Sequence, residues 1–196
     1  MTRASRNALA AGLGLWALLA LPPLRVGLEA TLAGHMAVQL PLLVAAGWWL
    51  GRVPGPVRAD ELAGFNRFGA PGVLLAAFTL AFWLLPRSLD AALQDPAWEA
   101  AKLLSVPLLA GVPLGRSWPR LPGLGRAALW ANLLPMLGVM GWVYIQSPVR
   151  LCNSYLLDQQ DLLGRVLLGI AALLGLYWVG WTFLGGLGRR LARETD

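Results

Sequence analysis

The sequence predicts an all-α, polytopic transmembrane helical bundle of about six spans, with both termini on the cytoplasmic side. Three observations lead to this fold class. The 196 residues are 57% hydrophobic and only 13% charged, a balance that soluble domains of this size do not show. Six apolar runs approach the roughly 20 residues that a helix needs to cross a hydrocarbon core about 30 Å thick. Arginines are concentrated in alternate connecting segments, as the positive-inside rule requires.

The six predicted spans form a single transmembrane domain, residues 1–196. The first run also resembles a signal peptide, but Pro22 and Pro23 follow it without a small-residue cleavage site, so we expect a retained helix. The fourth span begins early because Asp95 is suited to the N-cap and Pro96 to the first helical position. The predicted spans are residues 7–24, 28–50, 69–85, 96–114, 124–145 and 162–184.

The distribution of basic residues predicts the orientation. Eleven arginines fall in one set of connecting segments and five basic residues in the other, so the first set is predicted to be cytoplasmic. The cytoplasmic set is Arg3, Arg6, Arg52, Arg58, Arg67, Arg116, Arg120, Arg126, Arg189, Arg190 and Arg193. The opposite set is Arg25, Arg87, Lys102, Arg150 and Arg165.

The same census excludes several classes of function. The net charge of +6 does not indicate nucleic-acid binding, because the basic residues are spread through short interhelical segments. The chain has no phosphate-binding loop, no nucleophile elbow and no zinc-protease motif. Its one histidine cannot ligate a bis-histidine haem, and its one cysteine, Cys152, cannot form an internal disulfide. We therefore expect a protein that is not an enzyme.

His35 is the first candidate for a functional role. It is the only histidine, it lies in the second span, and Gln39 follows it on the same helical face. Ionisable residues at membrane depth are costly and by default mark a functional site. The alternative, given equal weight, is a neutral imidazole hydrogen-bonded to a carbonyl group of a neighbouring helix.

Methionines near His35 and in the fifth span suggest a metal. Met136 and Met140 continue a stripe that starts at Asn132, and thioethers are soft ligands suited to Cu(I). Such stripes more often fill gaps in a hydrophobic core. The predicted metal-binding set is His35, Met36, Gln39, Met136 and Met140.

The loop before the last span carries a second group of polar residues, Asp158, Gln159 and Gln160. Asp158 or Asp161 is suited to the N-cap of the last helix, although a run of four polar residues exceeds what one cap requires. Arg165 is expected to pair with Asp161 four residues earlier or to extend outward. For Cys152 we weigh a metal ligand against an inert buried thiol, the commoner case.

The order of these motifs resembles the CtaG-like cytochrome c oxidase assembly factors, a family of polytopic membrane proteins implicated in copper handling. The chain differs at Gln39, where the family typically has a second histidine. The resemblance covers about two thirds of the chain and implies copper as cofactor and a membrane oxidase as partner. The similar segments are His35-Met36 with Gln39, the run 82–86, residues 89–93, Trp118-Pro119, and Asp158-Gln159-Gln160.

These observations give three functional hypotheses for a multi-pass protein of a bacterial-type inner membrane. The leading one is an accessory protein that assists assembly of a copper-dependent membrane oxidase and holds Cu(I) at the outer face. The alternative is a structural subunit of a larger respiratory or monooxygenase complex, without a metal site of its own. Transport of a small solute is the third, resting on the proline-interrupted helices and the buried histidine.

Overall fold

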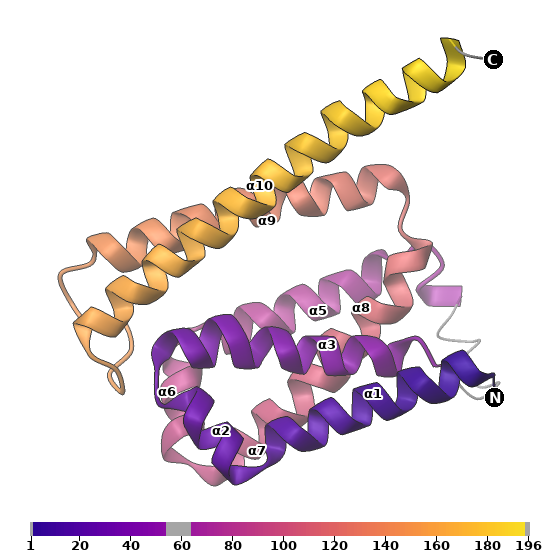
Figure 1. Cartoon of the computed structure of the whole chain (residues 1–196). Coiled ribbons are helices and arrows are strands. Elements are labelled where there is room, and N and C mark those ends of the chain that lie inside the picture. Colours follow the sequence, from indigo (N-terminus) through magenta and orange to yellow (C-terminus); the bar gives the residue numbers. More distant parts are fainter. Residues whose placement is uncertain (1, 54–63, 195–196) are drawn as a thin grey trace.

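The computed structural model is all-helical in the residues that it describes, which are 2–53 and 64–194, with side chains up to residue 180. The helices run back and forth between two ends of an elongated bundle (Figure 1). The short helices α2 and α6 lie at one end, while the start of α1 and the C-terminal end of α10 lie at the other. We call the end that holds the start of α1 and the C-terminal end of α10 the termini end. Arg58, one of the arginines of the predicted cytoplasmic set, lies outside the described residues.

Two helix pairs are sharply bent where a proline follows. Helix α1 (Arg3–Ala20) and α2 (Pro22–Glu29) meet at 70°, and α5 (Ala70–Trp83) and α6 (Pro86–Gln94) meet at 68°. In both cases the residue before the proline, Leu21 or Leu85, is extended, because a following proline disfavours the α conformation. The predicted first span of residues 7–24 is therefore shorter at its C-terminal end, and α2 turns away from it.

The next crossing begins with a π-helix, η1 (Gly34–Gln39), which continues into α3 (Leu40–Gly51). A second π-helix, η2 (Val106–Gly111), follows α7 (Pro96–Ser105) and leads into α8 (Val112–Ser117) and the 3-10 helix η3 (Trp118–Arg120). Asp95 accepts a hydrogen bond from the Ala97 amide, so the predicted N-cap is confirmed.

The last two helices form a hairpin, α9 (Gly123–Gln146) and α10 (Leu157–Glu194), which pack side by side. They cross closely at Gly141 and Gly164, where a Cβ atom on either glycine would lie within 2.7 Å of the other's carbonyl oxygen. Away from that crossing the hairpin is largely uncovered. Only 11% of the most apolar window of α9 and 17% of that of α10 is buried.

The centre of the bundle is the crossing of α3 and η2. Gly111 has no room for a side chain, because a Cβ atom there would lie 2.5 Å from the Val44 carbonyl oxygen. On the opposite helix, a Cβ atom on Gly47 would overlap the carbonyl oxygen of Pro107. These glycines let two backbones touch, a common device where helices associate in membranes.

Three helices of the described residues are long and apolar enough to cross a membrane, and the count rises to five if each bent pair is one span. The three are Pro96–Arg120, Gly123–Gln146 and Leu157–Gly180. The all-helical, membrane-spanning class predicted from sequence is therefore confirmed at this level.

Candidate functional site

A network of polar side chains is buried where α2, η1 and α7 meet. We call it the Lys102 network; its members are Glu29, His35, Gln39, Lys102 and Tyr155. Lys102, His35 and Gln39 have no exposed surface at all. Because such groups are expensive inside a lipid-embedded bundle, they mark this place as the candidate site. We call this end of the bundle the network end.

Lys102 is at the centre of the network. Its ammonium nitrogen lies 2.5 Å from Glu29 Oε1, 2.8 Å from His35 Nε2 and 3.0 Å from Gln39 Oε1. An ammonium group has three N–H donors and no acceptor, so these contacts use all of them. Gln39 Nε2 donates to the same Glu29 oxygen at 2.9 Å. The lysine charge is thus both paired with a carboxylate and fully hydrogen-bonded.

His35 joins Lys102 to the loop between α9 and α10. Its Nδ1 lies 3.0 Å from the Tyr155 hydroxyl, which donates its proton to the Glu29 carbonyl oxygen at 2.8 Å. Since Lys102 donates to Nε2, the ring proton is assigned to Nδ1, from which Tyr155 accepts. Both ring nitrogens are then satisfied by side chains. The sequence alternative of a hydrogen-bonded imidazole is close to this arrangement, with Lys102 and Tyr155 in place of a backbone carbonyl.

The π-helix η1 explains how His35 and Gln39 both reach Lys102. Pro41 has no N–H group to continue the α-helical pattern, and the turn before it is wide, with the Leu40 amide donating to the carbonyl of His35 five residues earlier. The predicted shared face of His35 and Gln39 is confirmed by their common partner. Single π-turns of this kind are frequent at functional sites.

A second ion pair joins the same two helices. Arg25 Nε lies 2.6 Å from Glu99 Oε1, with side chains 28% and 14% exposed. Along the chain, α2 therefore presents a cation and then a carboxylate, Arg25 and Glu29, and α7 presents a carboxylate and then a cation, Glu99 and Lys102. Removing charges from water costs several kcal/mol per ion unless they are paired and hydrogen-bonded. These two pairs hold the bent helix α2 against α7.

The loop between α9 and α10 is fixed to the network end by side chains. Both carboxylate oxygens of Asp90 accept backbone N–H groups, from Asn153 at 2.8 Å and Ser154 at 3.1 Å. Gln159 accepts from the Leu32 amide at 3.3 Å. Gln160 accepts from the Leu151 amide and donates to the Tyr144 carbonyl. Of the predicted polar residues, Gln159 thus ties the hairpin to the rest of the bundle, whereas Gln160 ties the loop to α9 within the hairpin.

The remaining loop predictions have mixed outcomes. Asp161 pairs with Arg165 at 2.9 Å, as the spacing predicts. Asp158 is exposed in the first turn of α10, and the helix begins at Leu157. The expectation that Asp158 or Asp161 is the N-cap is therefore wrong. The physical reason is that Gln160 and Asp90 already organise the loop, so the helix begins earlier.

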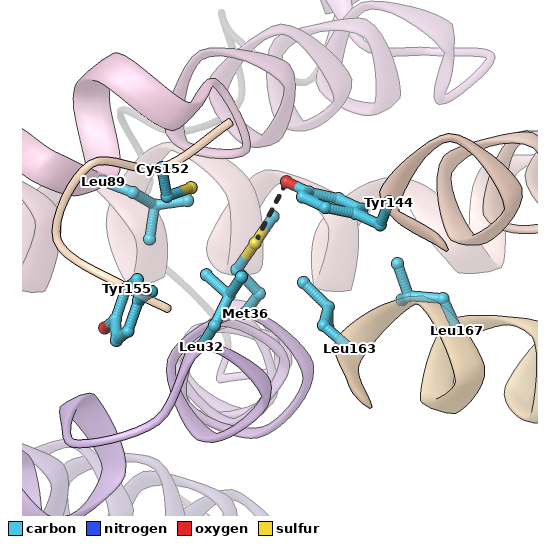
Figure 2. Close-up of a cluster of buried hydrophobic side chains, with 8 residues drawn as sticks. All are labelled: Leu32, Met36, Leu89, Tyr144, Cys152, Tyr155, Leu163 and Leu167. Atoms are coloured by element: carbon cyan, nitrogen blue, oxygen red, sulfur yellow. Dashed lines mark hydrogen bonds between the residues drawn. The ribbon is translucent and has the colours of Figure 1, made fainter. Parts of the chain in front are cut away.

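A cluster of sulfur atoms lies beside the network. The Tyr144 hydroxyl donates to Met36 Sδ at 3.5 Å, and the Cys152 thiol, which points toward that hydroxyl, is within hydrogen-bonding reach of it (Figure 2). Burial, with a smaller contribution from Asp90, raises the pKa of Cys152 to about 11. Met140 packs half-buried against the hydrophobic cluster that contains Met36 and Cys152, whereas Met136 is 43% exposed on α9. The predicted metal-binding residues therefore lie in three different places. His35 and Gln39 belong to the Lys102 network, Met36 and Met140 to the neighbouring hydrophobic cluster, and Met136 to the exposed surface of α9.

The members of the Lys102 network make their hydrogen bonds to one another. The ammonium group of Lys102, the Tyr155 hydroxyl and Gln39 Nε2 each donate to an acceptor within it. Burial, with a smaller contribution from Glu29, raises the pKa of Tyr155, so that its hydroxyl stays protonated. Among the described residues, no three His, Cys, Asp or Glu side chains converge to hold a metal ion. A fully satisfied network of this kind makes a local structure rigid.

Sequence reasoning missed the central residue. Lys102 was counted only as a basic residue of the less basic set of segments. One signal was present: it is the only lysine in a chain with fifteen arginines, and it lies in an apolar run. Glu29 and Tyr155 carried no comparable signal. No family model, no curated protein and no solved structure matches the chain.

Proposed function

We propose that this chain is a non-enzymatic accessory subunit of the inner membrane, which presents its α9–α10 hairpin to the helices of a larger membrane complex. The resemblance noted in the sequence makes a respiratory oxidase the complex to test first. Three features support the proposal, namely the topology, the uncovered glycines of the hairpin and the way in which the hairpin is held.

The course of the chain supports six crossings. Helices α1, η1 with α3, α5, α7 with η2 and α8, α9, and α10 run in alternate directions between the network end and the termini end (Figure 1). The start of α1 and the end of α10 then share one side of the membrane. The arginine census assigns that side to the cytoplasm.

The observation that carries the proposal is the set of uncovered glycines on the hairpin. Gly138 of α9 and Gly169 and Gly175 of α10 have no atom within 4 Å of an added Cβ position. A glycine inside a helix costs about 0.5–1 kcal/mol relative to alanine. Small residues on a membrane helix allow another helix to approach closely. Gly164 already has this role inside the chain, which leaves Gly169 and Gly175 for a partner.

The contacts of the α9–α10 loop support the same role. Tyr155, Gln159 and the two amides bound by Asp90 fix the hairpin to the network end, whereas its long apolar surfaces have little cover. A rigidly mounted hairpin loses less freedom on binding, and pre-organisation of this kind increases affinity. The Lys102 network therefore acts as a mount for an interaction surface.

The test is copurification from native membranes. Tagged wild-type protein should bring down a membrane partner in stoichiometric amount. The double variant Gly169→Leu/Gly175→Leu should reduce the yield of that partner roughly tenfold or more, because overpacking a helix contact costs about 1–3 kcal/mol. Gly14→Leu is the matched control, since Gly14 is equally uncovered but lies on α1. A wild-type protein recovered alone, or equal loss in the control, would contradict the proposal.

A second candidate function, Cu(I) handling, is favoured by the sulfur cluster. Met36 and Cys152 present a thioether and a thiol to the same hydroxyl group, and Met140 packs against the hydrophobic cluster that contains both. Soft sulfur ligands suit Cu(I). His35 fits a metal less well, because Lys102 faces its Nε2 and Tyr155 its Nδ1. The ligands we propose are therefore Met36, Cys152 and Met140.

Competition for Cu(I) with bicinchoninate tests this candidate. Cys152→Ser and Met36→Leu should each weaken binding at least about tenfold. Met136→Leu should not, because Met136 is the exposed methionine on α9, the helix that also carries Met140. Because the thiol must lose its proton, the apparent affinity should rise about tenfold per pH unit between about pH 6 and 8, below the pKa of Cys152. Loss on His35→Gln with no change on Cys152→Ser would restore the His35-centred site of the sequence analysis.

A further inference from the structure

A hollow of about 440 Å³ lies between the first half of α1 and the last turn of α3. Both segments lie at the termini end (Figure 1). The residues on its α1 side include Ala4, Ala8 and Ala11, and on its α3 side Trp49 and Arg52. None of these residues takes part in the Lys102 network or the hairpin. The hollow is therefore separate from both features, and its lining residues have no role in the proposed function.

The hollow is amphipathic. Ala4, Ala8 and Ala11 follow each other at helical spacing, so they form a narrow apolar wall. Ser5 and Arg52 add polar and cationic groups, and Trp49 is 39% exposed beside them. Tryptophan rings at a membrane surface favour the headgroup level. An apolar wall below a cation at this depth matches a molecule with a hydrocarbon chain and an acidic head.

The ion pairs and the arginine of the hollow lie at opposite ends of the bundle. The three ion pairs among the described side chains all involve segments of the network end, α2 with α7 and the first turns of α10. In the same part of the chain, Arg52 has no carboxylate partner and lies over the Trp48 ring at 5.3 Å. Trp48 contacts Trp118, over which Arg126 lies at 5.6 Å. Arg52 and Trp49 are thus the arginine and the tryptophan that line the hollow, and Arg52 attracts negative charge to it.

We propose that the hollow binds one anionic phospholipid, with the phosphate against Arg52 and an acyl chain along the alanines of α1. A lipid fits better than a free phosphate, because free phosphate would leave the alanine wall uncovered. The site does not depend on the partner complex or on copper. It would fill the gap between α1 and α3 in the leaflet at the termini end.

The test is native mass spectrometry of the detergent-solubilised full chain, titrated with phosphatidylglycerol, phosphatidylcholine or inorganic phosphate. Wild type should retain one phosphatidylglycerol in preference to phosphatidylcholine, and phosphate should not compete. Arg52→Gln should weaken phosphatidylglycerol retention roughly fivefold, the factor that one arginine contributes at an anionic surface. Ala8→Phe, which fills the hollow and keeps the charge, should weaken retention as well.

Arg67→Gln is the matched control, because Arg67 is also an exposed arginine lying over an aromatic ring, Phe68, but does not line the hollow. It should retain phosphatidylglycerol like wild type. Equal loss in Arg67→Gln and Arg52→Gln would show only general surface charge, and wild-type retention in Ala8→Phe would show that the hollow is not the site. Either result overturns the proposal. Unchanged thermal unfolding of each variant in phosphatidylcholine nanodiscs verifies its fold.

Discussion

Replacing Lys102 with methionine should destabilise the protein by about 3–5 kcal/mol, the largest effect expected of any single change. The side chain is fully buried, and its removal leaves the Glu29 carboxylate, 9% exposed, without its cation. His35 Nε2 and Gln39 Oε1 each lose their donor at the same time. Most of the cost comes from these stranded groups rather than from the loss of an attraction.

The measurement is reversible unfolding in mixed micelles with increasing dodecyl sulfate, monitored by tryptophan fluorescence. The double variant Lys102→Met/Glu29→Gln should recover part of the loss, because it removes the unpaired buried charge. Arg165→Gln serves as control: its pair with Asp161 is 71% and 39% exposed, and such pairs contribute about 0–1 kcal/mol. If Lys102→Met unfolds like Arg165→Gln, the network does not hold the network end together.

Gly47→Ala should produce the second large effect. A single methyl group at this position overlaps the carbonyl oxygen of Pro107 and crowds the Cα of Gly111 at 2.8 Å. Both neighbours are backbone atoms, which cannot move aside by changing a rotamer, so α3 and η2 must separate. Overpacking typically costs about 1–3 kcal/mol, and contact with backbone puts this change at the upper end.

Gly14→Ala provides the contrast in the same unfolding experiment. Gly14 lies inside α1 with no atom within 4 Å of an added Cβ, so alanine there should be neutral or stabilise by about 0.5–1 kcal/mol. The same chemical change thus has opposite expected signs at two helical glycines. Equal unfolding midpoints for the two variants would mean that the close crossing of α3 and η2 does not exist.

Much of the helical organisation was predictable because apolar run length and proline position act locally. The predicted spans at 96–114 and 124–145 fall within Pro96–Arg120 and Gly123–Gln146, and the cap at Asp95 formed as expected. The main differences are in the first two spans. In the first, Leu21 is extended before Pro22 and α2 turns away. Hydropathy extends the predicted first span to residue 24, because an apolar run gives no sign that the helix bends at Leu21. The second, predicted over residues 28–50, begins inside α2, and η1 with α3 is not among the helices long and apolar enough to count as a span.

The candidate site was predictable only in part. His35 and Gln39 were found because burying a lone imidazole is expensive wherever it lies, and their spacing placed them on one face. Their shared partner, Lys102, is more than 60 residues away in sequence. Nothing local indicates that its side chain turns inward to Glu29 rather than outward to the membrane surface.

The sequence by itself determined that this chain folds as membrane-spanning helices, because no other structure satisfies the backbone of such long apolar runs in lipid. It also determined where several of those helices begin, through prolines and a capping aspartate. The tertiary structure alone decided what the polar residues do. Hydrogen bonds and ion pairs act over about 3 Å, so whether a charge in an apolar run is exposed, paired or stranded depends on which helix lies beside it.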